Sequence, residues 1–573
     1  MIRLILDLDP FGHLEFSDPR GVVAADALSE VRPVLRAADA AATDGRWAVG
    51  FVSYEAAPAF DSALRVRQGD RGPLAWFGIF DHPVEPSLRT AGEARLSLLG
   101  SDMSRGEYAA AVGVVRDALA RGAAYQANLT FRLRGRFEGD ALGLYRRMRS
   151  AQGGRHSALF EIDGRAIVSA SPELFFERDG DRLTVRPMKG TARRGRSGEE
   201  DQRAAAALAA SDKERAENVM ITDLMRNDLG RIARVGTVNV GELCAIERYR
   251  TVFQMTSTVH ADLGTGAGLE NVFGALFPCG SVTGAPKVSA MRLIADLERS
   301  PRGVYCGALG VVAPGGRASF NVAIRTVDVD LDKGEAIYGT GGGITWLSSP
   351  DAEWDEALAK ASFLGEPEPG FRLVETMRLE RGTVARLERH LARLEASARY
   401  FDFGFDVHSA RAALDAVARA HPIGGRRLRL LLSEAGGLEV ENAALPEPAE
   451  EPLAVALARS PVSRRDRFLF HKTTHRETHK ARRRERLDAF DVVMQNGEGE
   501  VTELTIGNLV AEIGGERLTP PRDAGLLAGT FRSELLANGA VRERTLRPSD
   551  LRSARRLWLV NSLRGWVPVR LLD

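Results

Sequence analysis

Two pairs of glutamates occur at helical spacing in this 573-residue sequence. Glu214 and Glu217 lie three residues apart in SDKERAENVMITDLMRNDLGRI, whose pattern predicts a helix over 211–232, and Glu353 and Glu356 repeat the spacing in DAEWDEALAKA. Each pair shares one helix face, where like charges repel modestly. A solvated face explains either pair taken alone, and a bound divalent cation such as Mg²⁺ is the chemical alternative.

A glutamate and a lysine form a second combination that could do chemistry. Glu173 and Lys189 lie in PELFFERDGDRLTVRPMKGTARRG, on segments that we expect to be neighbouring strands. In one buried pocket the acid could donate a proton and the amine could act as a nucleophile, if burial shifted both pKa values toward neutrality. Outside such a pocket the two residues would form an ordinary surface pair.

Two glycine-bearing turns could receive an anion. In PCGSVTGAPKVSAMRLIADL a Gly/Ser/Thr turn leads into a helix with Pro286 near its first position, which leaves backbone N–H groups free. The segment is not a P-loop, because Lys287 does not have the required spacing and no Ser or Thr follows it. In YGTGGGITWLSSP the glycines 341–343 follow a predicted strand and would let a carboxylate approach the main chain.

The stretch 464–486, RRDRFLFHKTTHRETHKARRRER, is very basic. His471, His475 and His479 recur every four residues and could in principle hold a metal, and the arginines could bind RNA. No Cys accompanies the histidines, and the aromatic residues are confined to Phe468 and Phe470, before the first histidine. We therefore expect a solvated basic helix here.

Patterns of strands and helices alternate along the chain and predict an α+β fold with many strands. Two prolines and two glycines in GEPEPG place a domain boundary at about 366–370, giving a first domain over 1–365 and a second over 371–573. The Pro/Glu/Ala stretch at 444–455 predicts a subdomain break in the second domain.

The composition excludes several classes of protein. With 78 basic and 77 acidic residues the chain is nearly neutral, so it lacks the net field expected of a protein that binds nucleic acid or an anionic membrane. The three cysteines are too few and scattered for a disulfide framework. The first residues read as a strand and not as a signal peptide, and no long apolar stretch predicts a membrane span. We expect a soluble cytoplasmic protein that binds small molecules.

The first part of the chain resembles the chorismate-utilising enzymes. SPELFF, RPMKGTARRG, DKERAENVMITDLMRNDLGRI, FQMTSTV, PCGSVTGAPK, YCGALGV, NVAIRT and GTGGGITWLSSPDAEWDEALAKA follow the family's order. The resemblance covers about 100–364 strongly and 1–99 more loosely, through GFVSYEAA. It implies a large α/β sandwich similar to anthranilate synthase component I. Lys189 and the AEN at 216–218 resemble the aminodeoxychorismate synthase branch, whereas other branches typically carry Ala and AEH there.

The resemblance also implies roles for individual residues. Lys189 would attack the chorismate ring as its C4 hydroxyl leaves, Glu173 would protonate that hydroxyl, and ammonia would then displace the lysine. Four glutamates would hold Mg²⁺, two directly and two through water: Glu217, Glu356, Glu214 and Glu353. Substrate contacts would come from Ser281, Tyr305, Arg325, Gly341, Gly342 and Gly343. Cys279 and Ser281 depart from the family, where Ala and Thr are common at these positions.

The second part resembles the fold-type IV pyridoxal-phosphate enzymes, which have two subdomains. Its motifs are LVETMRLERG, HLARLEASA, HKTTHRETHKA, GEGEVTELTIGNLV, TPPRDAGLLAGTFRSELL and LWLVNSLRGWVPV, over about 370–573. The resemblance implies that Lys472 is the Schiff-base lysine and that Glu503 pairs with the pyridine nitrogen. The phosphate of pyridoxal 5′-phosphate would be held by Arg393, Gly529, Thr530 and Ser562.

Together the two resemblances imply a bifunctional enzyme that makes 4-aminobenzoate for folate, as a synthase fused to an aminodeoxychorismate lyase. The alternatives are a D-amino-acid or branched-chain aminotransferase as the second domain, and an anthranilate synthase-like first domain. A scaffold or RNA-binding protein remains the alternative outside enzymes. Cys244, Cys279 and Cys306 all lie inside synthase motifs, so we expect a separate glutamine amidotransferase subunit as a partner. Fold-type IV relatives are commonly homodimers through this domain.

Overall fold

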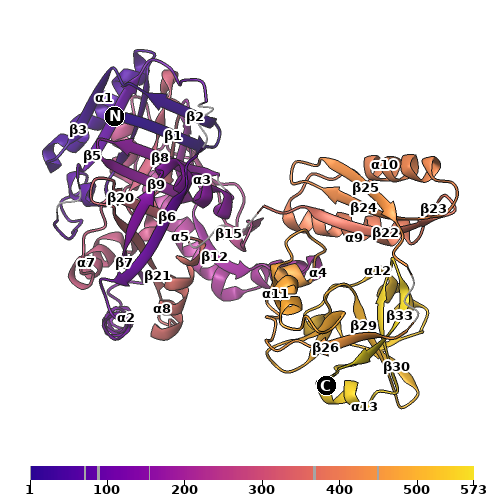
Figure 1. Ribbon diagram of the computed structural model, residues 1–573. Helices are drawn as coiled ribbons and strands as arrows, with labels where there is room; N and C mark the ends of the chain where they lie inside the picture. Colours follow the sequence, from indigo (N-terminus) through magenta and orange to yellow (C-terminus); the bar gives the residue numbers. More distant parts are fainter. Residues whose placement is uncertain are drawn as a thin grey trace. The chain divides into compact units, whose positions relative to one another are not determined.

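The computed structural model describes residues 2–69, 72–86, 91–153, 155–364, 370–447 and 451–572 (Figure 1). The chain divides into two compact units. The first comprises residues 1–193 and 205–368, and the second comprises 194–204 and 369–573. The predicted boundary at 366–370 lies outside the described residues except for Gly370. The sequence did not predict that residues 194–204 belong to the second unit.

Two nine-stranded sheets dominate the first unit. One sheet runs, in spatial order, β17 (Gly284–Ala285), β7 (Gln126–Gly139), β21 (Glu335–Ile344), β20 (Thr326–Asp330), β9 (Arg165–Ser171), β8 (His156–Ile162), β1 (Ile2–Leu8) and β2 (Gly12–Ser17), with β6 (Ala94–Ser101) on β7. The other runs β13 (Asn239–Val240), β16 (Val259–Asp262), β11 (Arg182–Val185), β10 (Leu174–Asp179), β19 (Ala318–Val322), β18 (Ala308–Val312), β4 (Trp47–Val52), β5 (Ala75–Phe80) and β3 (Gly21–Ala25). A small third sheet has the order β12 (Met188–Arg193), β15 (Val252–Thr256), β14 (Ala245–Arg248).

Alternating residues explain why the two large sheets pack face to face. Leu4 and Leu6 of β1 join a core with Phe51 of β4, from the other sheet. Ile5, between the two leucines, joins a different core on the opposite face of its own sheet. Because successive side chains of a strand point to opposite faces, a strand buried on both faces reads as a nearly continuous apolar run. The first unit is therefore a sandwich, as the sequence predicts.

Helices supply the outer layers of this sandwich. The core on the outer face of the second sheet includes residues of α1 (Leu28–Thr43), α5 (Asp212–Gly230) and α6 (Leu269–Leu276). The core on the outer face of the first includes residues of α2 (Arg105–Ala120), α3 (Ala141–Gln152), α7 (Lys287–Leu297) and α8 (Pro350–Ala359). Helix α5 begins after Ser211, whose side chain accepts a hydrogen bond from the Glu214 amide. This cap places the first glutamate pair in the opening turns of the helix.

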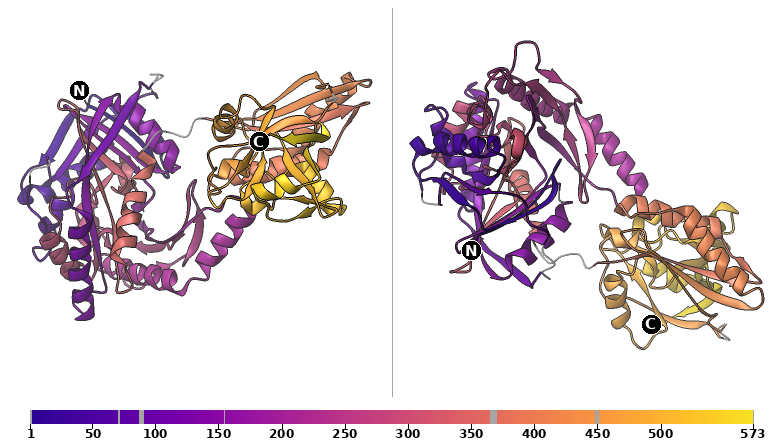
Figure 2. Two further views of the ribbon diagram at one scale, coloured as in Figure 1. Left: turned by 60° about the horizontal axis from the view of Figure 1, so that its bottom comes forward. Right: turned by 90° about the horizontal axis from the view of Figure 1, so that it is seen from above.

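The second unit contains two sheets in two subdomains (Figures 1 and 2). The four-stranded sheet has the order β23 (Thr383–Val384), β22 (Leu373–Glu380), β24 (Gly425–Leu432), β25 (Leu438–Ala444), and its core includes α9 (Leu387–Phe401) and α10 (Val407–Ala420). The eight-stranded sheet has the order β28 (Val501–Leu504), β27 (Asp491–Gln495), β26 (Leu453–Leu457), β33 (Gly565–Leu571), β32 (Arg556–Asn561), β29 (Asn508–Ile513), β30 (Glu516–Thr519), β31 (Arg542–Glu543). The chain passes from the four-stranded to the eight-stranded sheet between β25 and β26, where the sequence predicts a subdomain break. Residues 448–450 lie outside the described residues.

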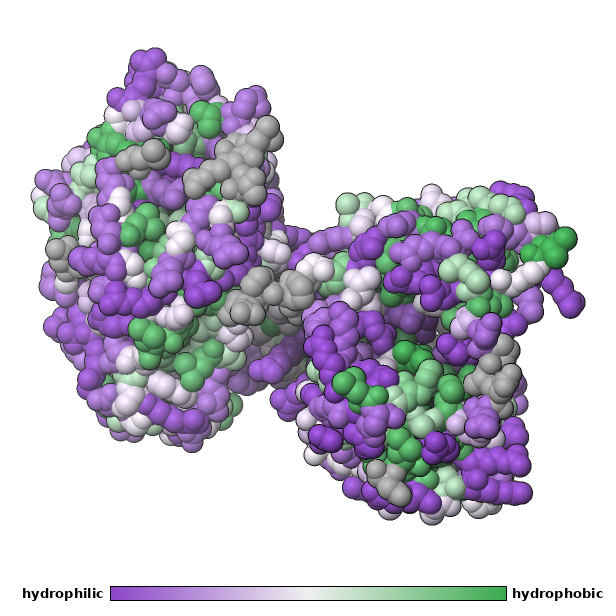
Figure 3. All heavy atoms as spheres, in the orientation of Figure 1, coloured by the Kyte–Doolittle hydropathy of each residue, from purple (hydrophilic) through white to green (hydrophobic). Residues whose placement is uncertain are grey.

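Helix α4 (Gly198–Ala209) runs across the boundary at residue 204. The faces of both units seen in Figure 3 are mostly hydrophilic, with small hydrophobic areas. In the described part of the chain, no helix combines the length and the apolar character needed to cross a membrane.

Candidate active sites

One cavity of the first unit brings together every residue that the sequence analysis assigned to the synthase site. Its lining includes Glu173, Lys189, Ser281, Tyr305, Arg325, Gly341, Gly342, Gly343, Glu214, Glu217, Glu353 and Glu356. These residues come from segments far apart in the sequence, including both glutamate-bearing helices, α5 and α8. The two glutamate pairs therefore face a common space, and neither is only a solvated helix face.

Glu173 and Lys189 both line the cavity, but they do not lie on the neighbouring strands that the sequence predicts. Glu173 directly precedes β10 of a large sheet, whereas Lys189 lies on β12 of the three-stranded sheet, so they are not on neighbouring strands. The reason is the segment 182–185, which pairs with β10 as β11 before the chain leaves the large sheet. Ser281 connects the two residues instead. Its carbonyl accepts a hydrogen bond from the Lys189 ammonium at 3.1 Å, and its side chain hydrogen-bonds the Glu173 carboxyl group.

Burial shifts the pKa values of this pair toward each other. Removal from water raises the pKa of Glu173 to about 7, although Ser281 and Lys189 oppose the change. The same loss of water lowers the pKa of Lys189 from its usual value. Glu173 is 4% exposed, and its Oε1 atom has no hydrogen-bond partner. An acid that is protonated near neutrality and has a free oxygen in a cavity is equipped to give a proton to a ligand.

The four glutamates share the cavity with two lysines. Lys360 contacts Glu356 at 2.9 Å and donates a hydrogen bond to the Gly341 carbonyl, while Lys213 lies 3.9 Å from Glu214 and 4.0 Å from Glu217. Burial raises the pKa of Glu217 and of Glu353, and the neighbouring carboxylates raise both further. Within the described residues no three Asp, Glu, His or Cys side chains gather as a preformed metal cage. The arrangement suits an ion that takes few carboxylates and keeps its waters.

Arg325 and the glycines form the rest of the wall. Burial lowers the pKa of Arg325, and its guanidinium has no hydrogen-bond partner among the described side chains and carbonyls. An unpaired buried cation requires an anion. A Cβ atom at Gly343 would lie 1.9 Å from Gln126 Nε2, and at Gly339 it would lie 2.2 Å from the Tyr305 ring. Gly339 is therefore needed for close packing against the Tyr305 ring, whereas at Gly343 the nearest atom is the movable end of the Gln126 side chain. Sequence reasoning missed Gly339 and Gln126.

The predicted anion site at the start of α7 does not face this cavity. Lys287 donates a hydrogen bond to Asp228 at 2.9 Å and another to the Leu276 carbonyl, and it is absent from the lining. Pro286 is the residue before the helix, and Ala285–Pro286 is a cis peptide bond. Only the preceding turn, residues 280–283, contributes to the site, through Ser281 and Val282.

A second cavity lies within the second unit, between residues of its two subdomains. Its lining includes all the residues that the sequence analysis assigned to the cofactor: Arg393, Lys472, Glu503, Gly529, Thr530 and Ser562. The carbonyl of Lys472 accepts a hydrogen bond from the Val374 amide of β22, at 3.0 Å, which ties the lysine to the four-stranded sheet. Burial, with further contributions from Arg393 and Arg476, lowers the pKa of Lys472 to about 8. A substantial fraction of the amine is then neutral at physiological pH.

Two buried acids lie at the second cavity: Glu503 lines it, and Glu375 lies behind His390 and Arg393. Glu503 accepts hydrogen bonds from the Asn508 side chain at 3.0 Å and the Leu527 amide at 3.1 Å. Glu375, 1% exposed, contacts Arg393 at 2.6 Å and His390 at 2.6 Å. Burial opposes ionisation of Glu375, yet Arg393 and His390 lower its pKa to about 2.

Sequence reasoning missed Glu375 and His390, although both stand in the quoted motifs LVETMRL and HLARL. His390 Nε2 lies 2.8 Å from the Ser562 hydroxyl and 3.2 Å from the Thr530 hydroxyl, so it joins two of the predicted phosphate ligands. The signal in the sequence was the spacing of His390 and Arg393, which puts both on one face of α9. Burial lowers the pKa of His390.

The expectation of a solvated basic helix over 464–486 is wrong. Helix α11 covers only Glu477–Arg484, and residues 468–473 are mostly buried, whereas Arg464 and Arg465 are exposed. His471 is 6% exposed and stacks on Tyr400, His475 packs on Phe468, and His479 lies 3.8 Å from Glu503. The three histidines do not converge on a point, because the segment is not one continuous helix. Arg476 lines the cavity and donates to the Thr505 carbonyl.

Comparison with known proteins assigns a family to each part of the chain. Residues 83–366 match the family described as chorismate binding enzyme, and residues 372–572 match class IV amino-transferases. Anthranilate synthase component 1 of Methanothermobacter thermautotrophicus is 34% identical over 55% of this chain and 72% of its own length. Aminodeoxychorismate synthase component 1 of Salmonella typhimurium is 38% identical over 47% of this chain and 58% of its own length.

The solved structure of anthranilate synthase component I from Streptococcus pneumoniae shares the fold of the first unit. It superposes with a TM-score of 0.54 at 23% identity, over 63% of this chain and 92% of that one. The chain spans little more than half the length of several curated relatives, such as 59% of an anthranilate synthase component 1 from Haloarcula marismortui. The chain belongs to the chorismate binding enzymes, as an aminodeoxychorismate synthase-like domain that is followed in the same chain by a class IV amino-transferase domain.

Proposed function

We propose that the first unit converts chorismate and ammonia to 4-amino-4-deoxychorismate and that the second eliminates pyruvate from this product to give 4-aminobenzoate. The observation that carries the proposal is the pairing of Lys189 with Glu173 in one cavity through Ser281. An amine nucleophile opposite a protonated acid can replace a hydroxyl group, which is a poor leaving group until it is protonated. Anthranilate synthases and aminodeoxychorismate synthases have nearly the same sequence identity to this chain. The choice between the two activities therefore depends on individual residues.

In the first reaction the Lys189 nitrogen bonds to the chorismate ring as the bond from C4 to its hydroxyl oxygen breaks. Glu173 gives its proton to that oxygen, which leaves as water. Ammonia then forms the new bond at C4, and the bond to Lys189 breaks, which restores the lysine. Arg325 and Tyr305 lie in the same cavity and are suited to hold a substrate carboxylate.

The residues of the first cavity fit Mg²⁺, with Glu217 and Glu356 as direct ligands and Glu214 and Glu353 acting through water. Buried carboxylates that repel one another are relieved by a divalent cation. Bound Mg²⁺ would supply a positive charge for a substrate carboxylate. Lys213 and Lys360 stand beside these carboxylates and would balance their charge without the ion.

The residues of the second cavity fit pyridoxal 5′-phosphate. Lys472 provides a partly neutral amine, Glu503 is a buried carboxylate for the pyridine nitrogen, and Gly529 precedes α12 (Thr530–Ala537), whose first amides suit a phosphate. Bound pyridoxal phosphate would withdraw electrons from the substrate carbon that loses its proton. Lys472 would hold and move that proton at the ring carbon that bears the amine.

Three further arginines favour aminodeoxychorismate as the substrate of this cavity. Arg427 and Arg429 lie on one face of β24, and Arg564 lies in the loop before β33; all three line the cavity. Arg429 pairs with Glu441, whereas the guanidinium groups of Arg427 and Arg564 have no partner among the described residues. Aminodeoxychorismate carries two carboxylates, and a branched-chain amino acid carries one. Two free cations in addition to the paired ones suit the dianion.

The ammonia is proposed to come from a separate glutamine amidotransferase subunit. Cys244, Cys279 and Cys306 are all buried, and burial raises the pKa of Cys279 to about 12 and of Cys306 to about 11. Because the thiolate is the nucleophile, these two thiols are unsuited to attack glutamine.

The test is to incubate the full chain with chorismate, ammonium, Mg²⁺ and pyridoxal phosphate and to identify products by mass. We expect 4-aminobenzoate and pyruvate in equal amounts, and accumulation of aminodeoxychorismate in Lys472→Ala. Anthranilate or isochorismate as product would reject the synthase step. Transfer of the amino group to 2-oxoglutarate would reject the lyase step in favour of an aminotransferase. Glutamine should replace ammonium only when a glutaminase subunit is added.

A further inference from the structure

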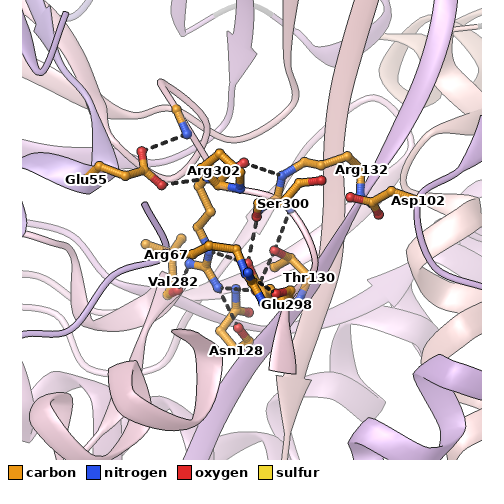
Figure 4. Close-up of polar contacts among 12 residues, drawn as sticks. Glu55, Arg67, Asp102, Asn128, Thr130, Arg132, Val282, Glu298, Ser300 and Arg302 are labelled. Atoms are coloured by element: carbon orange, nitrogen blue, oxygen red, sulfur yellow. Dashed lines mark hydrogen bonds and ion pairs between the residues drawn. The ribbon is translucent and has the colours of Figure 1, made fainter. Parts of the chain in front are cut away.

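A buried charge network contacts Val282, in the turn over residues 280–283 (Figure 4). Its centre is Glu298, which is 2% exposed and lies between Arg302, 2% exposed, and Arg132, 1% exposed. The Glu298 carboxylate accepts hydrogen bonds from Arg302 at 2.7 and 3.1 Å and from Arg132 at 3.0 Å. It also accepts from the amide and the hydroxyl of Thr130, at 2.9 and 2.7 Å. Burial opposes its ionisation, but the two arginines lower the pKa of Glu298 below its usual value.

Arg302 uses its remaining donors on two backbone carbonyls near the catalytic pair. One terminal nitrogen donates to the Val282 carbonyl at 2.7 Å, and the other donates to the Asn128 carbonyl at 2.8 Å (Figure 4). The Asn128 amide in turn donates to the Thr283 carbonyl at 2.8 Å. Arg302 therefore bridges the turn over residues 280–283 and strand β7, beside the direct backbone hydrogen bond between Asn128 and Thr283.

Val282 follows Ser281, the residue that connects the proposed nucleophile to the proposed acid. The Ser281 carbonyl accepts from Lys189 at 3.1 Å, and its side chain hydrogen-bonds Glu173. A shift of the Val282 peptide would move this carbonyl and hydroxyl together, since adjacent peptide planes share a Cα atom. The Lys189 amine and the Glu173 carboxyl group thus depend on a turn that Arg302 holds.

Fold stability alone is a weak explanation for this network. Two charges taken from water into a protein interior lose much hydration energy, and apolar replacements of similar volume are often as stable. The planar guanidinium group of Arg302 instead fixes the relative positions of its partners, because it donates hydrogen bonds to Glu298, Val282 and Asn128 in one plane. Glu55 fixes the backbone at the other end, accepting from the Arg302 amide at 2.7 Å and the Gly303 amide at 2.8 Å.

We propose that Arg302, oriented by Glu298, is a positioning residue for the synthase step: it sets the Val282 carbonyl, and through Ser281 it sets the reacting geometry of Lys189 and Glu173. The inference rests on the proposed function of the first unit. Arg302 does not line the cavity, so it acts through the backbone of Val282 and Asn128, which it holds. The groups proposed to hold the substrate, such as Arg325 and the glutamates, lie on other segments and should keep their positions when Arg302 is lost.

The experiment compares Arg302→Ala with Arg299→Ala in the full chain, measured as chorismate consumed in the presence of ammonium and Mg²⁺. Arg299 is three residues away and pairs with Glu107 on the surface, so its loss controls for removal of a nearby charge. A small misplacement of reacting groups costs up to about a hundredfold in rate. For Arg302→Ala we expect kcat to fall about 10- to 100-fold, KM for chorismate to change less than about threefold, and ~10 mM guanidinium to restore much of kcat. Arg299→Ala should match the wild type with and without guanidinium.

An unchanged kcat in Arg302→Ala, or a rise in KM that accounts for the whole loss, would overturn the proposal. So would a loss of kcat that guanidinium does not restore in a protein with wild-type circular dichroism. If Arg302→Ala does not fold, Glu298→Gln replaces it, since the amide keeps the size and the Thr130 contacts; a wild-type kcat there would also overturn the proposal. Wild-type protein that makes anthranilate would refute the proposed function, while chorismate consumption would still test Arg302.

Discussion

The two units treat buried carboxylic acids in opposite ways. In the first unit Glu173 keeps an unpartnered oxygen, and burial raises its pKa to about 7. In the second unit Glu375 is buried as deeply, but its contacts with Arg393 and His390 lower its pKa to about 2. The first acid is left able to exchange a proton near neutrality, and the second is a permanent anion that orients its neighbours.

This difference follows from the source of the reacting groups in the reaction proposed for each unit. In the reaction proposed for the first, the protein itself would supply both the acid and the nucleophile, so one of each must be left incompletely paired. In the second, the proposed cofactor supplies the electron-withdrawing group, and the acids serve to fix cations and amides around it. Both lysines, Lys189 and Lys472, have lowered pKa values because burial disfavours their charged forms.

The largest expected effects come from replacing Lys189 or Lys472, each of which should abolish a different reaction. Lys189→Ala should lower formation of aminodeoxychorismate by more than about ten-thousandfold, because the covalent route is lost, while added aminodeoxychorismate is still converted to 4-aminobenzoate. Lys472→Ala should show the reverse pattern and should lose the visible absorbance of lysine-bound pyridoxal phosphate. The measurement is product analysis with each substrate. Lys333→Ala and Lys480→Ala, at exposed surface ion pairs, serve as controls. Loss of both activities in either variant would mean that the reactions are not divided between the units.

The next effect tests the unpaired acid. Glu173→Gln should lower kcat for chorismate by about 10²- to 10⁴-fold, because the amide cannot protonate the leaving hydroxyl. Glu177→Gln is the matched control, since Glu177 lies on β10 close by but does not line the cavity. Steady-state rates of chorismate consumption decide the question. A wild-type rate in Glu173→Gln would transfer the role of acid to another group.

Much of this organisation could be predicted from the sequence. The strand pattern of residues 2–8 and the helix over 212–230 follow directly from hydrophobic periodicity and the Ser211 cap. The residues predicted for each site all line one cavity per unit, because the motif order of the two families carries that information.

The rest depends on contacts between segments that no local pattern encodes. Glu173 and Lys189 were placed on neighbouring strands, since nothing in the intervening residues shows that β11 pairs within one sheet and β12 in another. The basic stretch was read as a surface helix, because its charge says nothing about His471 packing on Tyr400. No pattern in the sequence singles out Glu298 and Arg302, and only the fold shows that both are buried.

A smaller effect concerns the lysine of the second cavity. Because burial lowers the pKa of Lys472 to about 8, the neutral amine that captures pyridoxal phosphate predominates above this pH and decreases about tenfold per unit below it. The rate of capture by apo-protein, followed by the visible absorbance, should rise with pH and level off near 8. Arg476→Gln removes a nearby cation that also lowers this pKa, so its plateau should begin at higher pH. A capture rate that still rises steeply at pH 9.5 would show that Lys472 titrates as an exposed lysine.

The smallest expected effect is on the free energy of unfolding, where replacement of Glu173 and of Glu375 should have opposite signs. The folded pKa of Glu173 lies above its unfolded value of 4.5, so its contribution is intact below pH 4.5 and is lost as pH rises through about 7. Glu173→Gln should thus be about 2–3 kcal/mol more stable than wild type at pH 8 and nearly equal to it at pH 4.5. The folded pKa of Glu375 is lowered, so its contribution is present above pH 4.5 and is lost toward pH 2. Glu375→Gln should therefore be less stable at pH 8 by a similar amount. If the thermal midpoints of both variants move in the same direction at pH 8, the proposed contrast is wrong. Glu173 would then not differ from Glu375 as an unpaired reactive acid differs from a paired structural one.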